Sequence, residues 1–426
     1  MIERLKYKFT ADAKRALLLF FYLSEERSKK ILDRILSLPK EIVNSEVSKN
    51  TRLFEHRHKN FETLIFNNFK KVESLLPDNN PISDEVKKLI GFSFSKEYTI
   101  ESAALFNPSI VLHPDQENLL ENEIRFIISL RAVGEGHISS IEFITGIFNG
   151  IDIKFEERSK YLVTYTKKTT PDYYLNQPDP VIKEANYDIS FSGNELLSER
   201  IIFPSSSTEI NGMEDLRLVR FVNDDGSIVY YGTFTAYDGR NIHPQLLETT
   251  DFINFKIRTL GGKQAVDKGI ALFPRKVNGK YAMISRQDGE NIRIMFSDDI
   301  YQWEESTILK SPKYGWDAIQ LGNCGSPIET PDGWLLFTHA VGPFRRYVLS
   351  ACLLDLNDPT KIIGDFSEPL LEPNDEEREG YVPNVVYTCG GLLYNKDAIL
   401  LPYAMSDSAT GFAIVKINDL LNKFIR

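Results

Sequence analysis

The chain has 426 residues and a formal net charge of −10, with hydrophobic residues at 42% and charged residues at 26%. This composition is that of an ordinary globular protein, and the length suits one large domain with an appendage, or two to three domains. The acidic balance disfavours nucleic acid and anionic membrane surfaces as partners, because their phosphates would be repelled.

The cysteines, the histidines and the first residues of the chain predict a cytoplasmic protein without a metal centre. Cys324, Cys352 and Cys389 lack the spacing of metal ligands, and three cysteines form no disulfide framework. The six histidines are dispersed along the chain. The apolar run at residues 16–23 is too short to cross a bilayer, and no small-residue cleavage signal follows it.

Residues 1–98 are predicted to form a helical N-terminal extension. Apolar residues recur at three- and four-residue steps within residues 61–76 and again within residues 31–36, which gives each stretch one apolar helix face. Pro39 and Pro77 punctuate the region. Because an appended apolar helix often packs against a second copy, the extension is compatible with a homo-oligomer.

Residues 99–426 are predicted to form a β domain built from repeats. Turn-forming segments at 225–226, 278–279, 332–333 and 395–397 each precede a strand-like apolar run. The interval from residue 226 to 279 is 53 residues, from 279 to 333 it is 54, and from 333 to 395 it is 62. Strand repeats of this size are typical of propeller blades, so about 325 residues at roughly 60 per blade predict a five-bladed β-propeller.

Each of these strand-like runs ends in polar residues at a similar position. The ends carry Tyr237, Arg286, His339 and Asp407. In equivalent blades such side chains converge on one end of the central channel, and repeat folds concentrate function on a shared face. The alternative, that each residue is only the polar end of its own strand, explains four residues in register less well.

The segment Asn211–Arg217 carries the strongest chemical signal. After the turn at 211–212, Glu214 and Asp215 are adjacent and Arg217 follows, just before the apolar run 218–222. Neighbouring acidic and basic groups at a strand entrance suit proton transfer on a polar ligand. Taken alone, a solvated charge cluster at a hairpin explains the segment equally well.

Together these segments resemble glycoside hydrolase family 130, the β-mannoside phosphorylases and β-mannosidases, over roughly residues 100–415. The family's Glu-Asp-Pro-Arg signature is present as Glu214-Asp215-Leu216-Arg217, with Leu in place of Pro. Further similar segments are residues 325–336, 353–359 and 382–387, with His339 at the family's Tyr-His-Gly and Asp407 near the end. The resemblance implies a five-bladed β-propeller, as the repeats do, and residues 1–98 resemble an extension of one long-form branch.

The resemblance also implies roles for individual residues. Asp215 is the expected general acid, acting through a mannose hydroxyl. It must be protonated near neutral pH, which Glu214 would favour by repulsion and Arg217 would oppose. We expect inverting cleavage of β-mannosidic linkages in small manno-oligosaccharides, β-1,2-linked by family branch, without a cofactor. The expected substrate-binding residues are Asn107, Glu214, Arg217, Tyr237, Asp238, Arg286, His339 and Asp407.

The nucleophile opposite Asp215 decides between hydrolysis and phosphorolysis. Hydrolysis needs a carboxylate base roughly 6.5–9.5 Å from the acid. The candidates for this base are Glu135 and Glu290, followed by Asp317 and Glu379. Phosphorolysis uses inorganic phosphate as co-substrate and needs a cationic pocket, for which the candidates are Arg131, Lys268 and Arg286.

Two departures from the family pattern favour hydrolysis over phosphorolysis. The family phosphorylases usually carry a His-Arg pair where this chain has Ser285-Arg286, and the N-terminus is of the long form. A third hypothesis is a non-catalytic sugar-binding propeller. The joint presence of Asp215, Arg217, His339 and Asp407 disfavours it, because a decayed site would tolerate the loss of any of them.

Overall fold

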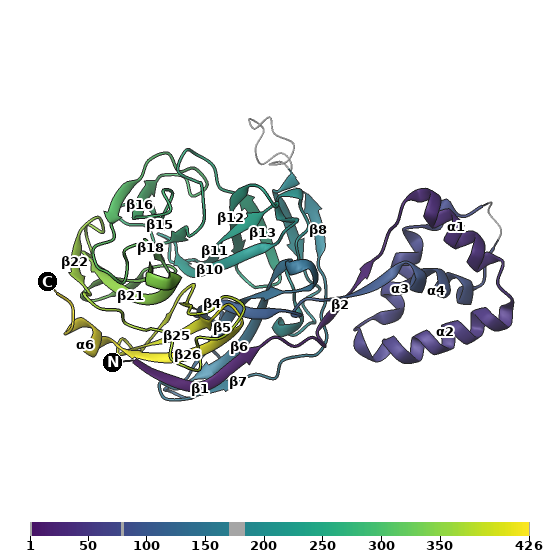
Figure 1. Cartoon of the computed structure of the whole chain (residues 1–426), viewed down its shortest axis with the longest axis horizontal. Coiled ribbons are helices and arrows are strands. Elements are labelled where there is room, and N and C mark those ends of the chain that lie inside the picture. Colours follow the sequence, from purple (N-terminus) through teal and green to yellow (C-terminus); the bar gives the residue numbers. More distant parts are fainter. Residues whose placement is uncertain (1, 78–80, 170–183, 426) are drawn as a thin grey trace. The chain divides into compact units, whose positions relative to one another are not determined.

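The computed structural model describes residues 2–77, 81–169 and 184–425, and the chain divides into two compact units (Figure 1). The larger unit comprises Met1–Ala11, Ser102–Arg158 and Thr164–Arg426. The smaller unit comprises Asp12–Glu101 and Ser159–Val163. The first residues therefore belong to the larger unit, whereas the sequence analysis placed them in the helical extension.

Strand β1 (Ile2–Thr10) explains this difference. It pairs antiparallel with β26 (Ala409–Lys416), almost at the other end of the chain. Leu5, Tyr7 and Phe9 are half-buried and alternate with exposed residues, which is the period-two pattern of a strand with one covered face. The Phe9 ring meets the Phe412 ring edge-on at 5.8 Å between centroids.

The smaller unit is helical, with a two-stranded sheet in its described residues. Its helices are α1 (Glu25–Leu36), α2 (Lys40–Phe54), α3 (Phe61–Lys70) and α4 (Asp84–Ser93), and its strands are β2 (Ala16–Phe20) and β3 (Ser95–Thr99). The Ser24 and Ser83 side chains cap α1 and α4 by accepting hydrogen bonds from backbone N–H groups. The predicted apolar stretches lie on α1 and α3, where Leu32, Ile35 and Phe69 share one buried cluster.

The larger unit contains five antiparallel sheets in its described residues. The first has β4 (Ala104–Leu112), β5 (Ile124–Val133), β6 (Ser139–Phe148) and β7 (Ile153–Phe155). The second has β10 (Met213–Val222), β11 (Ile228–Tyr237), β12 (Ile242–Thr249), β13 (Asn254–Thr259), β9 (Tyr187–Ser190) and β8 (Thr166–Thr169). The third has β14 (Ala271–Leu272), β15 (Tyr281–Ser285), β16 (Ile292–Ser297) and β17 (Thr307–Lys310).

The fourth and fifth sheets complete the larger unit. The fourth has β18 (Gln320–Asn323), β19 (Ile328–Thr330), β20 (Gly333–Gly342), β21 (Arg346–Leu354) and β22 (Ile362–Asp365). The fifth has β23 (Val386–Tyr387), β24 (Leu392–Tyr394), β25 (Ala398–Met405), β26 and β1. The short helix α6 (Ile417–Leu421) follows β26.

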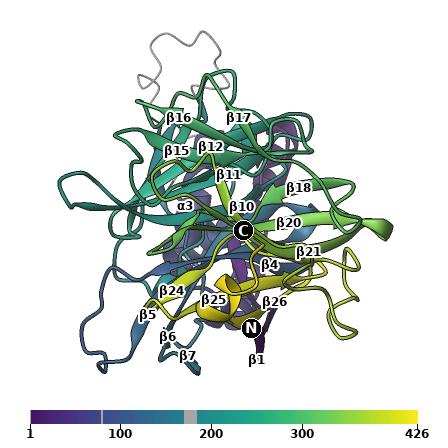
Figure 2. The same cartoon turned by 90° about the vertical axis from the view of Figure 1, so that its left-hand side faces the viewer.

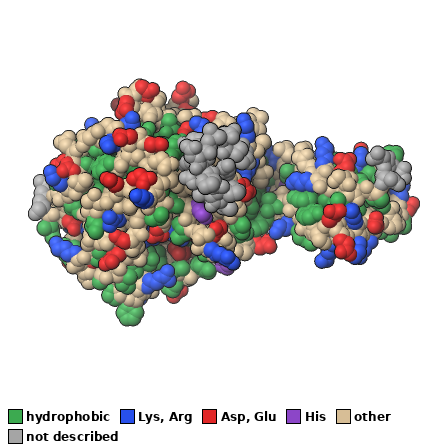
Figure 3. All heavy atoms as spheres, turned by 90° about the horizontal axis from the view of Figure 1, so that it is seen from above, with side chains coloured by type: hydrophobic (Ala, Val, Ile, Leu, Met, Phe, Trp, Pro, Cys, Tyr) green, Lys and Arg blue, Asp and Glu red, His purple; other side chains and the backbone are tan. Residues whose placement is uncertain are grey.

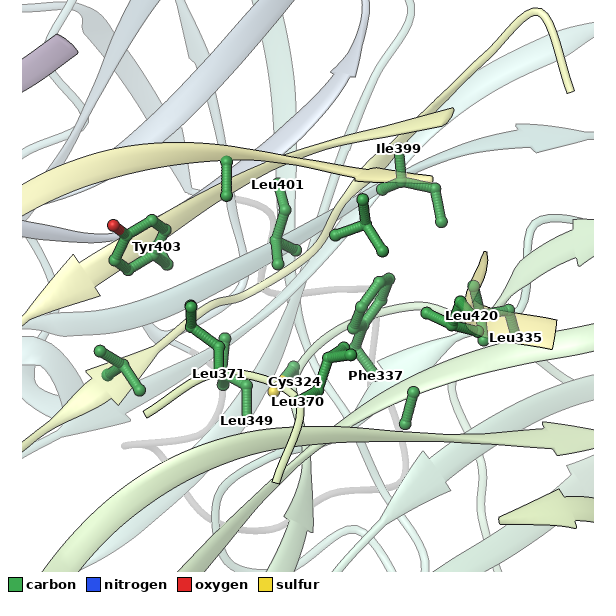
Figure 4. Close-up of a cluster of buried hydrophobic side chains, with 14 of the residues drawn as sticks. Cys324, Leu335, Phe337, Leu349, Leu370, Leu371, Ile399, Leu401, Tyr403 and Leu420 are labelled. Atoms are coloured by element: carbon green, nitrogen blue, oxygen red, sulfur yellow. The ribbon is translucent and has the colours of Figure 1, made fainter. Parts of the chain in front are cut away.

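Each sheet contacts the next one along the chain, and the fifth contacts the first. Strand β10 packs beside β4, β14 against β11, β18 against β15 and β16, β23 against β21, and β25 and β26 against β4. Figure 2 shows β4 and β10 in the inner part of the larger unit. Apolar clusters fill the spaces between neighbouring sheets. In Figure 4, Phe337 and Leu349 of the fourth sheet face Leu401 and Tyr403 of the fifth.

The four turns singled out by their spacing each lead into a strand that has paired neighbours on both sides, in four different sheets. They precede β11, β15, β20 and β25. Gly226, Asn278 and Gly279 have φ values of +82°, +51° and +80°, a left-handed conformation that glycine and asparagine tolerate in tight hairpins. The spacing of 53 to 62 residues in the sequence is therefore the spacing of successive sheets.

The surface of the described residues carries charges of both signs. Figure 3 shows Lys and Arg side chains interspersed with Asp and Glu side chains on the face seen from above. Within the described ranges, no helix has the length and apolar character needed to cross a membrane.

Replacing Arg4 by Ala is expected to destabilise the larger unit. The Arg4 Nε–H donates a 2.9 Å hydrogen bond to Oε1 of the buried Glu377, which also accepts the Tyr403 hydroxyl. Because the variant leaves a buried carboxylate short of its cation, and Arg4 is itself partly exposed, we expect a loss of about 1–3 kcal/mol in the free energy of unfolding. Urea unfolding followed by tryptophan fluorescence measures it, since all three tryptophans lie in this unit.

Lys6→Ala on the same strand is the matched control. Lys6 lies 4.0 Å from Asp152, and both side chains are largely exposed. We expect almost no change in its unfolding midpoint, because exposed ion pairs are screened by water. Equal losses in the two variants would show that the Arg4 contact has no special importance.

Candidate active site

One pocket of the larger unit gathers residues from all five sheets. Its volume is about 220 Å³, and it is lined by Asn107, Arg131, Glu214, Asp215, Lys268, Arg286, His339, Arg345, Tyr347, Val382, Val385, Tyr387 and Asp407. A larger cavity of about 340 Å³ lies farther along the same strands, at residues 110–112 and 218–222, but its lining is mainly aliphatic. The polar pocket is therefore the candidate active site.

Asn107 and Asp215 occupy matching positions in neighbouring strands. Each lies in a register shift, between Phe106 and Ser109 of β4 and between Glu214 and Arg217 of β10. Both are in the left-handed conformation, with φ values of +49° and +54°, which Asn and Asp tolerate better than most residues. Such bulges redirect a side chain out of the regular alternation of a strand. As a result, the Asn107 Nδ2–H donates a 2.7 Å hydrogen bond to the Asp215 carboxylate.

Glu214 is held by two cations from different sheets. The Arg131 guanidinium on β5 donates to Glu214 Oε1 at 2.7 Å, and the Lys268 ammonium, from the segment before β14, donates to Oε2. The same guanidinium donates to Asp215 at 3.4 Å. Glu214 is therefore engaged in ion pairs, and these pairs join the first three sheets at the pocket.

The charges around Asp215 favour its ionised form. Burial raises the pKa of Asp215, but Arg131 and Arg217 beside it outweigh burial and hold that pKa below its usual value. Arg217 is itself buried and donates to the hydroxyl of Tyr387 and to the Asp215 carbonyl oxygen. The sequence analysis set Glu214, which favours protonation of Asp215, against Arg217, which opposes it. In the structure Arg217 acts together with Arg131, and the two arginines prevail.

Asp407 has the opposite tendency. It lies in the turn between β25 and β26, where Ser406 and Asp407 both have positive φ values, of +47° and +50°. Burial and the neighbouring Asp215 carboxylate raise the pKa of Asp407 to about 6. The pocket thus contains one carboxyl group that loses its proton easily and one that retains it to near-neutral pH.

Arg286, Arg345 and His339 form another part of the pocket lining. Burial holds the pKa of His339 well below its usual value, and Arg286 and Arg217 act in the same direction, so His339 is neutral. Its ring stacks on Tyr347 at 6.0 Å between centroids. Within the described part of the chain, the buried Arg286 Nε–H has no hydrogen-bond partner.

The structure places several other predicted site residues outside this lining. Glu135, Glu290 and Glu379 are exposed. Asp317 is buried but accepts backbone N–H groups of its own turn, from Lys313 and Tyr314. The geometry therefore gives no support to any of these four carboxylates as a base opposite Asp215.

Tyr237 and Asp238 lie beside the lining rather than in it. The Tyr237 hydroxyl donates to Gly239, and its ring is 5.9 Å from the Lys268 ammonium. Backbone N–H groups of Asn241 and Arg240 lower the pKa of Asp238 by bonding its carboxylate, so Asp238 stabilises the turn before β12.

Sequence reasoning missed Arg345 and Tyr347 and gave no role to the lining residues between 382 and 387. Arg345 follows β20 in a short turn with a φ value of +54°. No motif marks this turn, whose place at the pocket depends on packing between sheets. The segment 382–387 was recognisable as similar to the family, but its motif did not show which of its side chains face the pocket.

Comparisons with known proteins identify the family of the chain. Residues 167–426 match the profile of the family described as Glyco_hydro_130, beta-1,4-mannooligosaccharide phosphorylase. The chain is 35% identical over 246 residues to the 1,2-beta-oligomannan phosphorylase of Thermoanaerobacter sp. (strain X514), covering 56% of this chain and 80% of that protein. It is 32% identical over 275 residues to a beta-1,2-mannobiose phosphorylase of the same strain, covering 61% and 87%.

Solved structures show the same fold. The beta-1,2-mannobiose phosphorylase of Listeria innocua, in complex with beta-1,2-mannobiose, has a TM-score of 0.51 at 22% identity, covering 76% of this chain and 92% of that one. A crystallised putative glycoside hydrolase of Parabacteroides distasonis has a TM-score of 0.53 at 19% identity, covering 75% and 88%.

The pocket lining contains Glu214 and Asp215 of the Glu214-Asp215-Leu216-Arg217 signature, together with His339 and Asp407. Arg217 is buried beside the lining rather than in it. The matched profile spans more than half of the chain, and the relatives process glycosides. The chain belongs to glycoside hydrolase family 130 and is a glycoside-processing enzyme.

Proposed function

We propose that the protein is an inverting β-mannoside phosphorylase, which cleaves β-1,2-linked manno-oligosaccharides with inorganic phosphate and releases mannose 1-phosphate. The observation that carries the proposal is the charge of the pocket. Four cationic side chains and three carboxylates line its described surface, although the chain has a net charge of −10. Such a local excess of positive charge suits an anionic co-substrate. Phosphorolysis therefore replaces the hydrolysis that the sequence analysis favoured, and the names of the relatives support the β-1,2 linkage.

We infer that the five sheets are the blades of a five-bladed β-propeller. The cyclic order of contacts between the sheets supports this architecture, as does the spacing of their hairpin turns. The pocket would then lie at one end of the central channel, where the ends of the inner strands meet.

Arg286, Arg345 and Lys268 are the proposed phosphate ligands. The Arg286 Nε–H is buried without a hydrogen-bond partner, which costs free energy, and a phosphate dianion offers it a charge-assisted hydrogen bond. Lys268 already binds Glu214, so it would be shared between this carboxylate and the anion. Neutral His339, lying beside Arg286, can donate a hydrogen bond without adding charge.

Phosphate binding also gives Asp215 a way to become the acid. In the unliganded pocket Arg131 and Arg217 keep it ionised, but a bound dianion adds negative charge and raises the pKa of nearby carboxyl groups. The proton moves from Asp215 to the glycosidic oxygen, directly or through a mannose hydroxyl. A phosphate oxygen bonds to C1 from the opposite face as the C1–O bond breaks, and the leaving oxygen keeps the electron pair. A β-linkage thus gives α-mannose 1-phosphate.

Hydrolysis would have to use Asp407 as its base, because Glu214 is held by Arg131 and Lys268. The pKa of Asp407 is raised to about 6, so this carboxylate is ionised only above that pH. An inverting hydrolase needs an ionised carboxylate that activates water. A phosphate dianion is already a nucleophile and needs no such base.

Turnover of β-1,2-mannobiose is expected to require phosphate. With phosphate present, the products should be mannose and mannose 1-phosphate in equal amounts, which phosphorus and proton NMR identify. Release of two mannose molecules at the same rate without phosphate would establish hydrolysis instead. Binding without turnover on any mannoside would support the non-catalytic propeller.

Asp215→Asn is expected to lower kcat about a hundredfold to ten-thousandfold, the range that a general acid supplies. Asn keeps the shape of the side chain and can still bond Asn107, so the thermal midpoint should change little. Glu290→Gln is the matched control, because this exposed carboxylate lies outside the pocket lining. Near-normal activity of Asp215→Asn would exclude Asp215 as the acid.

The pH dependence of kcat/KM should reveal the ionisation of the neighbouring carboxyl groups of Asp407 and Asp215. The pKa of Asp407 is raised to about 6, so the Asp407 proton is present below that pH and lost above it. If the reaction needs this proton, kcat/KM at constant phosphate dianion concentration falls as the pH rises through about 6. The falling limb should shift in Asp407→Asn. If kcat/KM falls at the same pH in the wild type and in Asp407→Asn, the assignment of this fall to the Asp407 carboxyl group is contradicted.

A further inference from the structure

We propose that exposed aromatic side chains at the mouth of the pocket bind sugar units beyond the scissile linkage, so that the enzyme prefers β-1,2-oligomannans of three or more units to mannobiose. The inference rests on the proposed function and specifies the chain length of its substrate. Two sites carry it, on loops from different sheets. We call them the aromatic rim: Phe344 on one side, and Tyr381 with His137 on the other.

Phe344 is an unusual residue for its position. Its side chain is 97% exposed, in the turn between β20 and β21. Its φ value is +59°, a conformation that costs a bulky residue free energy, and the next residue, Arg345, is also left-handed. Arg345 lines the pocket, and consecutive Cα atoms are about 3.8 Å apart, so the Phe344 backbone adjoins the pocket lining.

Tyr381 is held at the mouth by contacts from two other loops. Its side chain is 65% exposed, and its ring lies 5.5 Å from the His137 ring, which comes from the turn between β5 and β6. Its backbone N–H donates a 2.8 Å hydrogen bond to the hydroxyl of Ser408, next to Asp407. The following residue, Val382, lines the pocket. The Tyr381 backbone is thus tied to a residue next to Asp407, and most of the side chain is open to solvent.

The size of the pocket implies that a longer substrate must pass this rim. The volume of about 220 Å³ is below the range typical of sites that enclose larger ligands. A chain of three or four mannosyl units that reacts inside the pocket therefore extends out through its mouth. Exposed aromatic rings can cover the C–H faces of sugars while the sugar hydroxyl groups remain in water.

The test is the dependence of turnover on chain length in Phe344→Ala and Tyr381→Ala. With phosphate present, the ratio of kcat/KM for β-1,2-mannotetraose to that for β-1,2-mannobiose should exceed one in the wild type and fall about three- to tenfold in each variant. Leu120→Ala is the control, because Leu120 is 69% exposed in the turn that leaves β4 at its other end, past residues 110–112. A ratio unchanged in both rim variants would overturn the proposal.

A binding measurement separates the rim from the proposed chemistry. Calorimetric titration of Asp215→Asn with mannobiose and mannotetraose, without phosphate, should show tighter binding of the tetraose. The added Phe344→Ala substitution should remove most of that difference. This result would stand even if turnover proved independent of phosphate, in which case only the proposed function fails. Equal affinity of Asp215→Asn for the two sugars would overturn the rim.

Discussion

The ion pairs that Glu214 makes with Arg131 and Lys268 are the interaction on which the pocket depends. They join three sheets at one point, and only 11% of the Glu214 side chain is exposed. Buried charges of this kind are stable only when each has its partners, because an unpaired one carries a large desolvation cost. With Glu214 occupied in this way, Asp215 faces the pocket. Arg286 and Arg345, which form no ion pair with a carboxylate among the described residues, are left for a ligand.

The rest of the fold supplies the rigidity that this arrangement needs. Asn107, Asp215 and Asp407 all have left-handed backbones, each of which is less favourable than a regular strand. Apolar clusters between neighbouring sheets hold the strands on both sides of these residues. The positions of the polar groups are therefore set by the packing of the sheets and not by regular local backbone structure. Strand β1 adds a contact between the two ends of the larger unit, because it pairs with β26. The packing of the strands therefore determines the geometry of the site, because the site residues lie at the strand ends.

Local patterns predicted the regular parts of this protein well. Repeated turns marked successive sheets. Of the four residues predicted at the strand ends, Arg286, His339 and Asp407 line the pocket, and Tyr237 lies beside it. The pairing of β1 with β26 joins residues about four hundred positions apart, which no local pattern reveals. The same holds for Arg345, whose turn has no motif. Glu135 and Glu290 were selected by residue type near motifs, and residue type alone does not determine which way a loop carboxylate points.

The central claim is that the cations of this pocket are arranged for phosphate. Isothermal titration of phosphate into the unliganded enzyme tests it most directly, with Arg286→Gln compared with Arg275→Gln, whose guanidinium pairs with Glu329 at the aliphatic cavity. The account predicts binding to the wild type and to Arg275→Gln, and binding at least about tenfold weaker to Arg286→Gln. No measurable binding to the wild type, or equal affinity in all three proteins, would contradict it.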